Sequence, residues 1–329
     1  MSKRISRTML IVSVLLINLC MPMFAQGQKG DAGKAKKTEI WAILLDTKQE
    51  WFTEVIAGMN QAGEDMGVVV KIMSSNSDVA KEANLIDNYI AQQVDAISIS
   101  PQSDEASVPA VERAVNAGIP VITWNSKVNS PESKYFVGVN NYDLGSKTGE
   151  YAADYIKRNM NGSAKIAVVG TSKYSIGIDR VNGFIDEVTK VPGVEIVAQQ
   201  DAEFKEQSLS VTESILEANP ETEIIWCWNQ GALLGSLAAV KGKSNSDVIL
   251  MGTDMSIDLA RNMMEKDSKL VAVTTQQPYE IGYASIKAAV EVVKDGETAN
   301  ETLIPLKTYV QENLEELQKY LDDREYLIK

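Results

Sequence analysis

The hydrophobic positions of the chain follow two alternating patterns. Short runs of β-branched and aliphatic residues are separated by longer stretches in which apolar side chains recur every three or four positions. The first pattern is typical of buried strands and the second of amphipathic helices. They predict strands at 40–45, 68–73, 94–100 and 119–124, and helices at about 51–66, 79–92 and 104–117. Because the strand runs are apolar at nearly every position, we expect a parallel sheet covered by helices on both faces.

The same alternation starts again after a predicted strand at 135–139. Helices are predicted at about 142–159, 177–189, 206–218, 231–240, 256–265 and 278–294, and strands at 165–169, 194–198, 223–228, 248–252 and 270–274. The two series predict an α/β fold with two doubly wound parallel-sheet lobes. A last amphipathic helix is predicted at 313–323, with Leu314, Leu317 and Leu321 on one side. We expect it to pack on the second lobe, with contact to a partner as the alternative.

The first 25 residues differ in pattern from the rest. Three basic residues precede an apolar run that ends at Ala25, the order of a secretory signal peptide at 1–25. Residues 26–37, rich in Gly and Lys, are expected to form a flexible linker. A membrane anchor is one alternative, and a lipid anchor at Cys20 is another, although the large Leu19 before it suits lipoprotein processing poorly. The protein is therefore expected in the periplasm or another extracytoplasmic space.

The charge of the chain argues against nucleic acid as a partner. The formal net charge is −13 at pH 7. Residues 1–25 carry three positive charges and no negative one, so their removal would change the net charge to −16. An acidic surface of this kind repels phosphate backbones.

The composition also argues against an enzyme. The chain has no histidine, the commonest general base and a common metal ligand. No G-x-G-x-x-G motif follows a predicted strand and no D-x-[DN]-x-[DN]-G loop occurs, so no cofactor and no metal site is predicted. Cys227 would be the one cysteine left after cleavage, which excludes an internal disulfide. Its apolar neighbours predict a buried, unreactive thiol.

Polar and aromatic side chains follow the predicted strands, where parallel α/β sheets bind ligands. These residues are Asp46 to Phe52, Asn125 to Lys127, Thr171 and Ser172, Asn229 and Gln230, Asp254, and Gln276 and Gln277. Most are neutral hydrogen-bonding groups, and aromatic rings accompany them. This mixture is expected around a hydroxylated ligand such as a sugar or polyol, with flat faces that stack on rings.

Seven segments in order resemble one family. They are Trp51-Phe52, AGIPVITWNS (117–126), GVNNYDLG (138–145), GIDRVNGF (177–184), WNQGALLG (228–235), MGTDMS (251–256) and TTQQPYEIG (274–282). The arrangement resembles the type I periplasmic binding proteins of sugar ABC transporters, close to ribose- and galactose-binding proteins. The resemblance implies two lobes joined by a three-segment hinge, with 38–139 plus 277–306 in the N-terminal lobe and 140–276 plus 307–329 in the C-terminal lobe. It also implies a monomer that closes on its ligand and docks on a membrane permease.

The resemblance also implies which residues bind the ligand. Trp51 and Phe52 match the aromatic wall of one lobe, and Phe204 matches the stacking position of the other. Four polar residues match positions that hydrogen-bond sugar hydroxyls; they are Arg180, Asn229, Asp254 and Gln276. Asp254 could also cap the helix that starts near Ser256.

One segment departs from the ribose and galactose pattern. Asn125 and Ser126 stand where those relatives carry an Asp-Arg or Asp-Asn pair, which argues against ribose or an ordinary hexose. The segment TWNS is instead similar to relatives that bind autoinducer-2 or rhamnose. Lys48 and Lys127 could supply the missing charge, and Asp46, Gln49 and Trp228 are further candidates.

Three other functions remain as alternatives. An enzyme on the same scaffold would need a carboxylate acid/base pair that no motif nominates. A sugar-responsive repressor shares the architecture but begins with a helix-turn-helix domain in place of an export signal. A sensor would present its closed form to a chemoreceptor or sensor kinase, which is compatible with transport.

Overall fold

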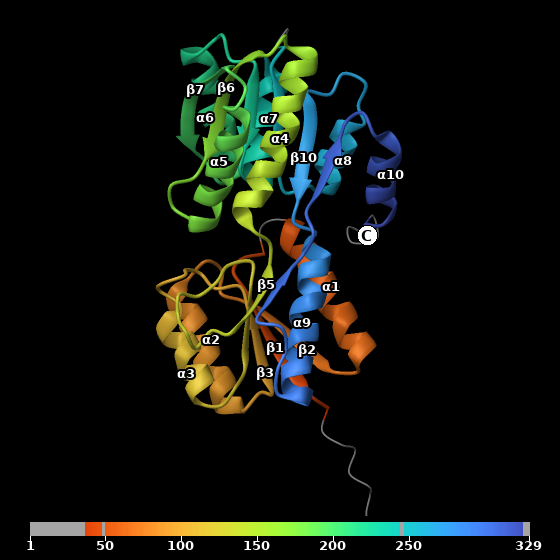
Figure 1. The fold of residues 1–329 in the computed structure, drawn as a ribbon. Coiled ribbons are helices and arrows are strands. Elements are labelled where there is room, and N and C mark those ends of the chain that lie inside the picture. The colour runs from red at the N-terminus through yellow and green to blue at the C-terminus, as the bar shows by residue number, and fades with distance from the viewer. Residues whose placement is uncertain (1–36, 48–49, 244–246, 325–329) are drawn as a thin grey trace, which may run out of the picture. The chain divides into compact units, whose positions relative to one another are not determined.

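The computed structural model describes residues 37–47, 50–243 and 247–324 (Figure 1). The predicted signal peptide, Cys20, and the linker up to residue 36 lie outside the described residues, as do Lys48 and Gln49. No helix within the described ranges is both long and apolar enough to cross a membrane.

The N-terminal lobe is built on a six-stranded sheet with the order β11-β5-β4-β3-β1-β2. All its neighbouring strands are parallel. The strands are β1 (Glu39–Leu44), β2 (Val69–Ser74), β3 (Ala96–Ile99), β4 (Val121–Trp124), β5 (Tyr135–Gly138) and β11 (Glu301–Leu303). The helices are α1 (Glu50–Met66), α2 (Val79–Gln92), α3 (Val108–Asn116) and α9 (Pro278–Asp295).

This sheet has a hydrophobic core on each face. Ile40, Ala42 and Leu44 of β1 pack in the core that includes residues of α1 and α9, whereas Ile43 packs with residues of α2 and α3. Successive side chains of a strand point to opposite faces, so a strand covered on both sides is apolar throughout. This explains the continuous apolar run from which the strand was predicted.

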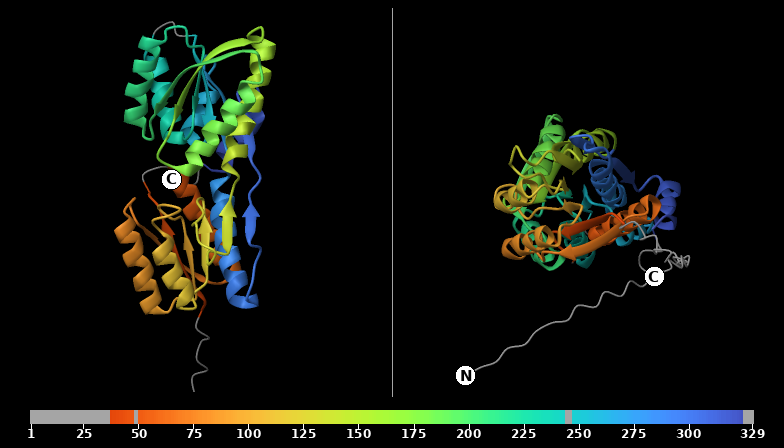
Figure 2. Two further views of the ribbon diagram at one scale, coloured as in Figure 1. Left: turned by 60° about the vertical axis from the view of Figure 1, so that its left-hand side comes forward. Right: turned by 90° about the horizontal axis from the view of Figure 1, so that it is seen from below.

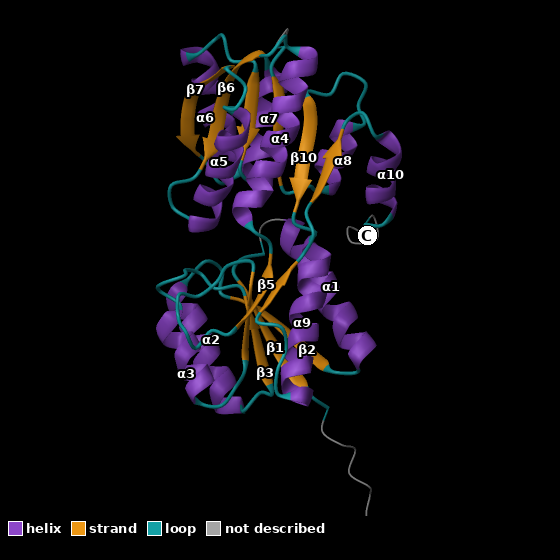
Figure 3. Ribbon diagram, viewed as in Figure 1, coloured by secondary structure: helices purple, strands orange, loops and turns teal. Residues whose placement is uncertain are grey.

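The C-terminal lobe repeats the same plan with a sheet in the order β12-β10-β9-β8-β6-β7. Its strands are β6 (Ser163–Gly170), β7 (Gly193–Asp201), β8 (Ile224–Cys227), β9 (Ile249–Thr253), β10 (Leu270–Thr275) and β12 (Lys307–Val310), of which β12 is antiparallel to β10. Its helices are α4 (Asn141–Asn159), α5 (Ser175–Val188), α6 (Lys205–Ala218), α7 (Gln230–Gly242), α8 (Ile257–Met263) and α10 (Leu314–Asp322). The structure confirms the predicted α/β class with two doubly wound sheets (Figure 3).

The chain passes between the two sheets three times. The passages follow β5, β10 and β11, and the segments that join the sheets can be followed in Figure 2. The carboxyl ends of β5 and β10 point toward the opposite lobe (Figure 3). The loops after the strands of both lobes therefore meet in the space between the two sheets.

Three details differ from the sequence prediction. The edge strands β11 and β12 were not predicted, because each is only three or four residues long. Helix α3 starts at Val108 and not at 104, because residues 104–107 form a turn. Leu314 is exposed although Leu317 and Leu321 are buried in the C-terminal lobe, so α10 buries a narrower face than predicted.

Candidate ligand-binding site

A cavity lies between the lobes at the carboxyl ends of the strands. The residues that line it are Leu45, Trp51, Phe52, Asn125, Tyr174, Ile176, Arg180, Glu203, Trp228, Asn229, Asp254 and Gln276. Eight of them are residues proposed from the sequence: Trp51, Phe52, Asn125, Arg180, Trp228, Asn229, Asp254 and Gln276. Doubly wound sheets bind small molecules at this edge.

The polar side of the cavity comes from the C-terminal lobe. Arg180 Nη1 donates to Asp254 Oδ2 at 2.9 Å, and Gln276 Nε2 donates to Asp254 Oδ1 at 2.7 Å. Arg180 also donates from Nε to Asn141 Oδ1 at 2.9 Å and from Nη1 to the Trp228 carbonyl oxygen at 3.0 Å. Arg180 is 2% exposed and Asp254 6% exposed, so the pair is a buried, charge-compensated unit.

Close packing of α5 on α4 sets the position of Arg180. A Cβ atom at Gly145 of α4 would lie 1.8 Å from the carbonyl oxygen of Arg180. A Cβ atom at Gly183 of α5 would lie 2.1 Å from the carbonyl oxygen of Tyr142. The two glycines therefore allow the backbones of α4 and α5 to approach each other closely beside Arg180. This close approach is a physical reason for Gly145 in GVNNYDLG and for Gly183 in GIDRVNGF.

The apolar side of the cavity comes mainly from the first turn of α1. Trp51 and Phe52 are buried and make an edge-to-face pair with ring centroids 5.0 Å apart. Trp51 also stacks on Trp124, with centroids 6.4 Å apart. Across the cavity, Tyr174 stacks on Trp228 at 6.1 Å, so each lobe contributes aromatic rings.

Two buried polar atoms of the cavity residues lack a protein partner within the described part of the chain. They are Nε1 of Trp51, a donor, and Oε1 of Gln276, an acceptor. Buried polar groups are nearly always hydrogen-bonded, because an unpaired one loses its hydration without compensation. Each of these atoms is therefore a candidate contact for a ligand.

Two asparagines at strand ends are held by hydrogen bonds within the protein. Asn125 adopts φ +64° and donates from Nδ2 to Ser100 Oγ at 3.3 Å. Asparagine tolerates this left-handed conformation better than most residues. Asn229 accepts from the Ala232 amide at 2.7 Å and is the N-cap of α7. One end of each amide is thus used within the protein.

Four of the remaining predicted residues do not line this cavity. Phe204 precedes α6 and is 39% exposed. The aromatic rings that the C-terminal lobe contributes to the cavity are those of Tyr174 and Trp228. Asp46 accepts from Ser77 Oγ at 2.8 Å. Ser126 and Lys127 line an adjoining hollow, and Lys127 pairs with Glu301 at 2.6 Å, so it does not supply the missing charge to this cavity.

The helix cap predicted for Asp254 is made by another residue. Ser256 caps α8 by accepting from the Leu259 amide at 3.2 Å. Both carboxylate oxygens of Asp254 are instead turned to Arg180 and Gln276.

Sequence reasoning missed four lining residues. Leu45, Tyr174, Ile176 and Glu203 line the cavity but were not proposed. Tyr174 could have been proposed from the sequence, because it follows Thr171 and Ser172 in the same strand-end loop. Its hydroxyl accepts from Lys173 Nζ at 2.6 Å and lies 3.3 Å from Glu203 Oε2, to which it donates. Burial and Glu203 raise the pKa of Tyr174 against the opposing effect of Lys173, so the hydroxyl is protonated at neutral pH.

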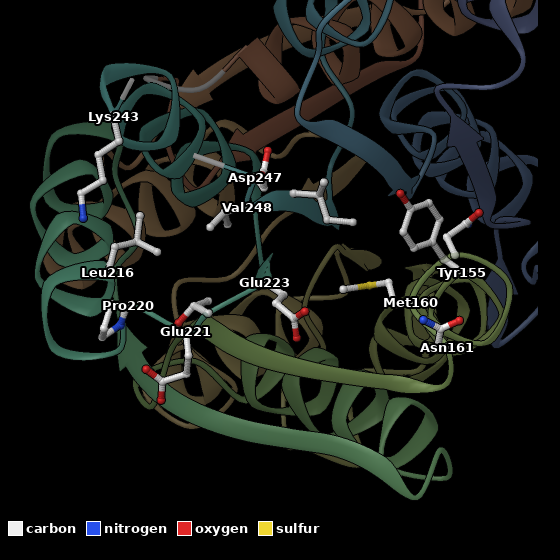
Figure 4. A pocket seen from close by; sticks show the side chains of 13 residues that line it. Tyr155, Met160, Asn161, Leu216, Pro220, Glu221, Glu223, Lys243, Asp247 and Val248 are labelled. Carbon is white, nitrogen blue, oxygen red and sulfur yellow. The ribbon is translucent and has the colours of Figure 1, made fainter. Parts of the chain in front are cut away.

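A larger hollow lies at the opposite end of the C-terminal lobe (Figure 4). Its lining includes Met160 after α4, Glu221 and Glu223 before β8, and Lys243 and Asp247 near β9. This is the amino end of the parallel strands, whereas ligands of such sheets bind at the carboxyl end. We therefore place the ligand site between the lobes. Within the described residues, no group of three or more acidic or Cys side chains could hold a metal ion.

Fold and cavity together define a two-lobed protein that encloses a small molecule between the carboxyl ends of two sheets. The sequence profile of the family described as "Periplasmic binding protein domain" matches residues 42–298. The chain therefore belongs to the periplasmic binding protein domain family, and the resemblance noted in the sequence is confirmed. Its relatives are transport binding proteins, which confirms the prediction that the chain is not an enzyme.

Relatives and solved structures agree with this assignment. The chain is 32% identical to the ABC transporter periplasmic-binding protein YphF of Escherichia coli K12, over 97% of this chain and 98% of the relative. It is 27% identical to the ribose import binding protein RbsB of Bacillus subtilis 168, over 94% of this chain and 100% of the relative.

Two crystal structures share the fold. The first is a carbohydrate transporter solute-binding protein of Agrobacterium radiobacter in complex with D-arabinose. It has a TM-score of 0.78 at 26% identity, over 86% of this chain and 99% of that chain. The second is a solute-binding protein of Actinobacillus succinogenes 130z with bound D-allose. It has a TM-score of 0.79 at 23% identity, over 85% of this chain and 100% of that chain.

Proposed function

We propose that this protein is an exported solute-binding protein that captures a sugar or sugar-like polyol between its lobes and delivers it to an ABC transporter permease. The observation that carries the proposal is the cavity with aromatic rings from both lobes and the Arg180–Asp254–Gln276 unit on one wall. Names of relatives support it, since they include ribose import proteins and structures with bound allose, arabinose and myo-inositol.

The charge balance of the cavity argues against an anionic ligand. Arg180 is the one cationic residue among the described residues that line it, and its charge is compensated by Asp254. An anionic ligand would have to displace this buried pair, which is costly. Hydroxyl groups can add to the pair, because a carboxylate has about four acceptor sites and Asp254 uses two of them for Arg180 and Gln276.

The apolar and the polar side of the cavity would contact different parts of the ligand. Rings of Trp51, Phe52, Tyr174 and Trp228 offer flat apolar surfaces for the C–H faces of a sugar ring. Arg180, Asp254 and Gln276 offer hydrogen bonds to its edge. Such a division gives affinity from stacking and orientation from a few polar groups.

The partners and the location of the protein are part of the proposal. We propose export through residues 1–25, action as a monomer, and docking of the closed form on a permease. Presentation to a chemoreceptor or sensor kinase uses the same closed form, and autoinducer-2 is the alternative ligand suggested by the segment TWNS.

A thermal-shift screen tests the proposed function. D-ribose, D-allose, D-arabinose, rhamnose, myo-inositol and autoinducer-2 are compared with neutral and acidic amino acids. A bound ligand at a hundredfold excess over its dissociation constant raises the unfolding free energy by about 2.7 kcal/mol. We expect at least one sugar, polyol or autoinducer to raise the melting temperature in the wild-type protein and much less in Arg180→Ala. A shift with amino acids and none with carbohydrates would contradict the proposal.

A further inference from the structure

The C-terminal helix α10 is anchored in the C-terminal lobe. Leu317, Tyr320 and Leu321 are buried in the core of that lobe. Tyr320 packs edge-to-face on Tyr309 of β12, with centroids 5.1 Å apart. The helix therefore moves with the C-terminal lobe.

Two side chains, one from this helix and one from the residue after its C-cap, reach the N-terminal lobe. The hydroxyl of Tyr320 donates to Glu54 Oε1 at 2.9 Å, and Arg324 Nε donates to Glu54 Oε2 at 2.9 Å. Glu54 belongs to α1 and its side chain is 2% exposed, whereas that of Arg324 is 12% exposed. The guanidinium of Arg324 also lies over the Tyr320 ring at 4.3 Å. The contact joins residues 266 and 270 positions apart in the sequence.

Glu54 lies in the part of α1 that lines the ligand cavity. It is one helical turn from Trp51, and Trp51 and Phe52 form the apolar wall. A shift of Glu54 toward or away from α10 would therefore move both rings, because a helix turn moves as a unit.

Charged and polar groups stand on both sides of this contact. The negative charge of Glu280 on α9 raises the pKa of Glu54, and Oε2 of Glu280 is buried without a partner among the described residues. Tyr309 and Lys307 of β12 stand near Tyr320 and Arg324 on the other side. Burial raises the pKa of Glu54, opposed by Arg324 and by the Tyr320 hydrogen bond. Losing either partner would leave a buried carboxyl group with fewer hydrogen bonds.

We propose that α10 and Arg324 form a strap that ties the C-terminal lobe to the first turns of α1 and positions Trp51 and Phe52 in the cavity. The strap is a fourth connection between the lobes, beside the three passages of the backbone. When the lobes open, they rotate about the strap and stay in contact there, because separation at this point would remove both hydrogen-bond partners of Glu54. The effect on ligand affinity rests on the proposed function, whereas the effect on α1 and on the lobes does not.

Hydrogen exchange and spin-label distances on the ligand-free full chain test the strap. The variants are Glu54→Gln, Tyr320→Phe and Arg324→Ala, with Arg113→Ala as the matched control. Arg113 pairs with Asp87 on the surface within the N-terminal lobe. We expect amide exchange of residues 51–56 on the order of tenfold faster in Arg324→Ala and unchanged in Arg113→Ala, because local opening loses a buried anchor. Spin labels at Asn84→Cys and Glu213→Cys, both exposed, should report a broader distance distribution between the lobes in Arg324→Ala.

Two results would overturn the strap. One is wild-type exchange at residues 51–56 in all three variants, and the other is an unchanged distance distribution. If Arg324→Ala does not fold, Tyr320→Phe removes only a hydroxyl and decides the question. Because both measurements need no ligand, failure to find a bound sugar leaves them interpretable. When a sugar that binds the wild type is available, the dissociation constant should rise several-fold in Arg324→Ala and stay unchanged in Arg113→Ala.

Discussion

Arg180 and Asp254 form an ion pair of 2.9 Å between the side of α5 and the loop after β9, with both side chains buried beside the cavity. Through Asp254, helix α5 is joined to the loop after β9, and Gln276 joins the loop after β10 to the same carboxylate. Its position makes it the centre of the predicted ligand contacts.

Asp254→Asn is expected to weaken sugar binding while the protein remains folded. The substitution removes a charged acceptor for ligand hydroxyls, a loss of about 1.5–3 kcal/mol in binding free energy. It also leaves the buried guanidinium of Arg180 without its counter-ion, which lowers the free energy of unfolding. Isothermal titration calorimetry measures the affinity, and circular dichroism checks the fold. Asp258→Asn, on the exposed side of α8, is the control. Equal affinities in Asp254→Asn and wild type would exclude Asp254 from the site.

Trp51→Phe tests whether the unpaired Nε1 atom contacts the ligand. The variant keeps an aromatic ring and loses the donor that is buried without a partner. We expect affinity to fall by about 1 kcal/mol, the usual net value of one hydrogen bond. Trp41→Phe serves as the control, because Trp41 Nε1 donates to Glu39 at the far end of β1. A larger loss in Trp51→Ala than in Trp51→Phe would measure the stacking contribution separately.

Gly145→Ala is expected to destabilise the protein and weaken binding together. The added methyl group would lie 1.8 Å from the Arg180 carbonyl oxygen, so α4 and α5 must move apart. Overpacking of this kind costs about 1–3 kcal/mol of unfolding free energy. Urea unfolding and calorimetry are the measurements. Gly242→Ala, with no atom within 4 Å of the added Cβ, should leave both quantities unchanged.

Cys227 is expected to resist thiol reagents in the native protein. It is fully buried, burial raises its pKa to about 12, and its thiol donates to Ser236 Oγ at 3.2 Å. A chain that starts at residue 26 carries this cysteine alone. Labelling at pH 8 should be negligible without denaturant and complete in guanidinium chloride. Rapid native labelling would mean that the core of the C-terminal lobe opens.

The pH dependence of stability should differ between Glu54 and Glu187. The pKa of Glu54 is raised by burial, so folding favours its protonated form. Its contribution to stability is then fully present below the ordinary pKa of 4.5 and decreases as the pH rises through the raised pKa. The melting temperature of wild type minus that of Glu54→Gln should therefore decrease between pH 4 and pH 7.

Glu187 provides a control of opposite sign. Lys190 lowers its pKa, so its contribution is present above 4.5 and is lost as the pH falls through the lowered pKa. The difference between wild type and Glu187→Gln should be small, because the pair is on the surface, and should increase with pH. These assignments would be contradicted if the melting-temperature difference between wild type and variant decreased with pH for Glu187→Gln or increased with pH for Glu54→Gln.

The secondary structure and much of the site could be predicted because their signals are local. Continuous apolar runs at 40–45 and 224–228 identified strands that are covered on both faces. Residues directly after strands, such as Asn229 and Asp254, could be assigned to one edge because parallel strands end together. Tyr174 was missed although it shares a strand-end loop with Thr171 and Ser172, because a single loop tyrosine has no distinctive pattern. Phe204, which the resemblance implied as a stacking ring, is not among the residues that line the cavity, because similarity in position does not set the direction of a side chain.

The amino-acid order alone therefore accounts for the class of fold, the repeated α/β plan and the edge at which polar groups gather, since all three follow from periodicity and from strand direction. The pairing of Arg180 with Asp254 and the meeting of Glu54 with Tyr320 and Arg324 depend on the tertiary structure. These partners are 74 to 270 residues apart, and helix packing and lobe placement bring them within hydrogen-bonding distance. No local pattern encodes such distances.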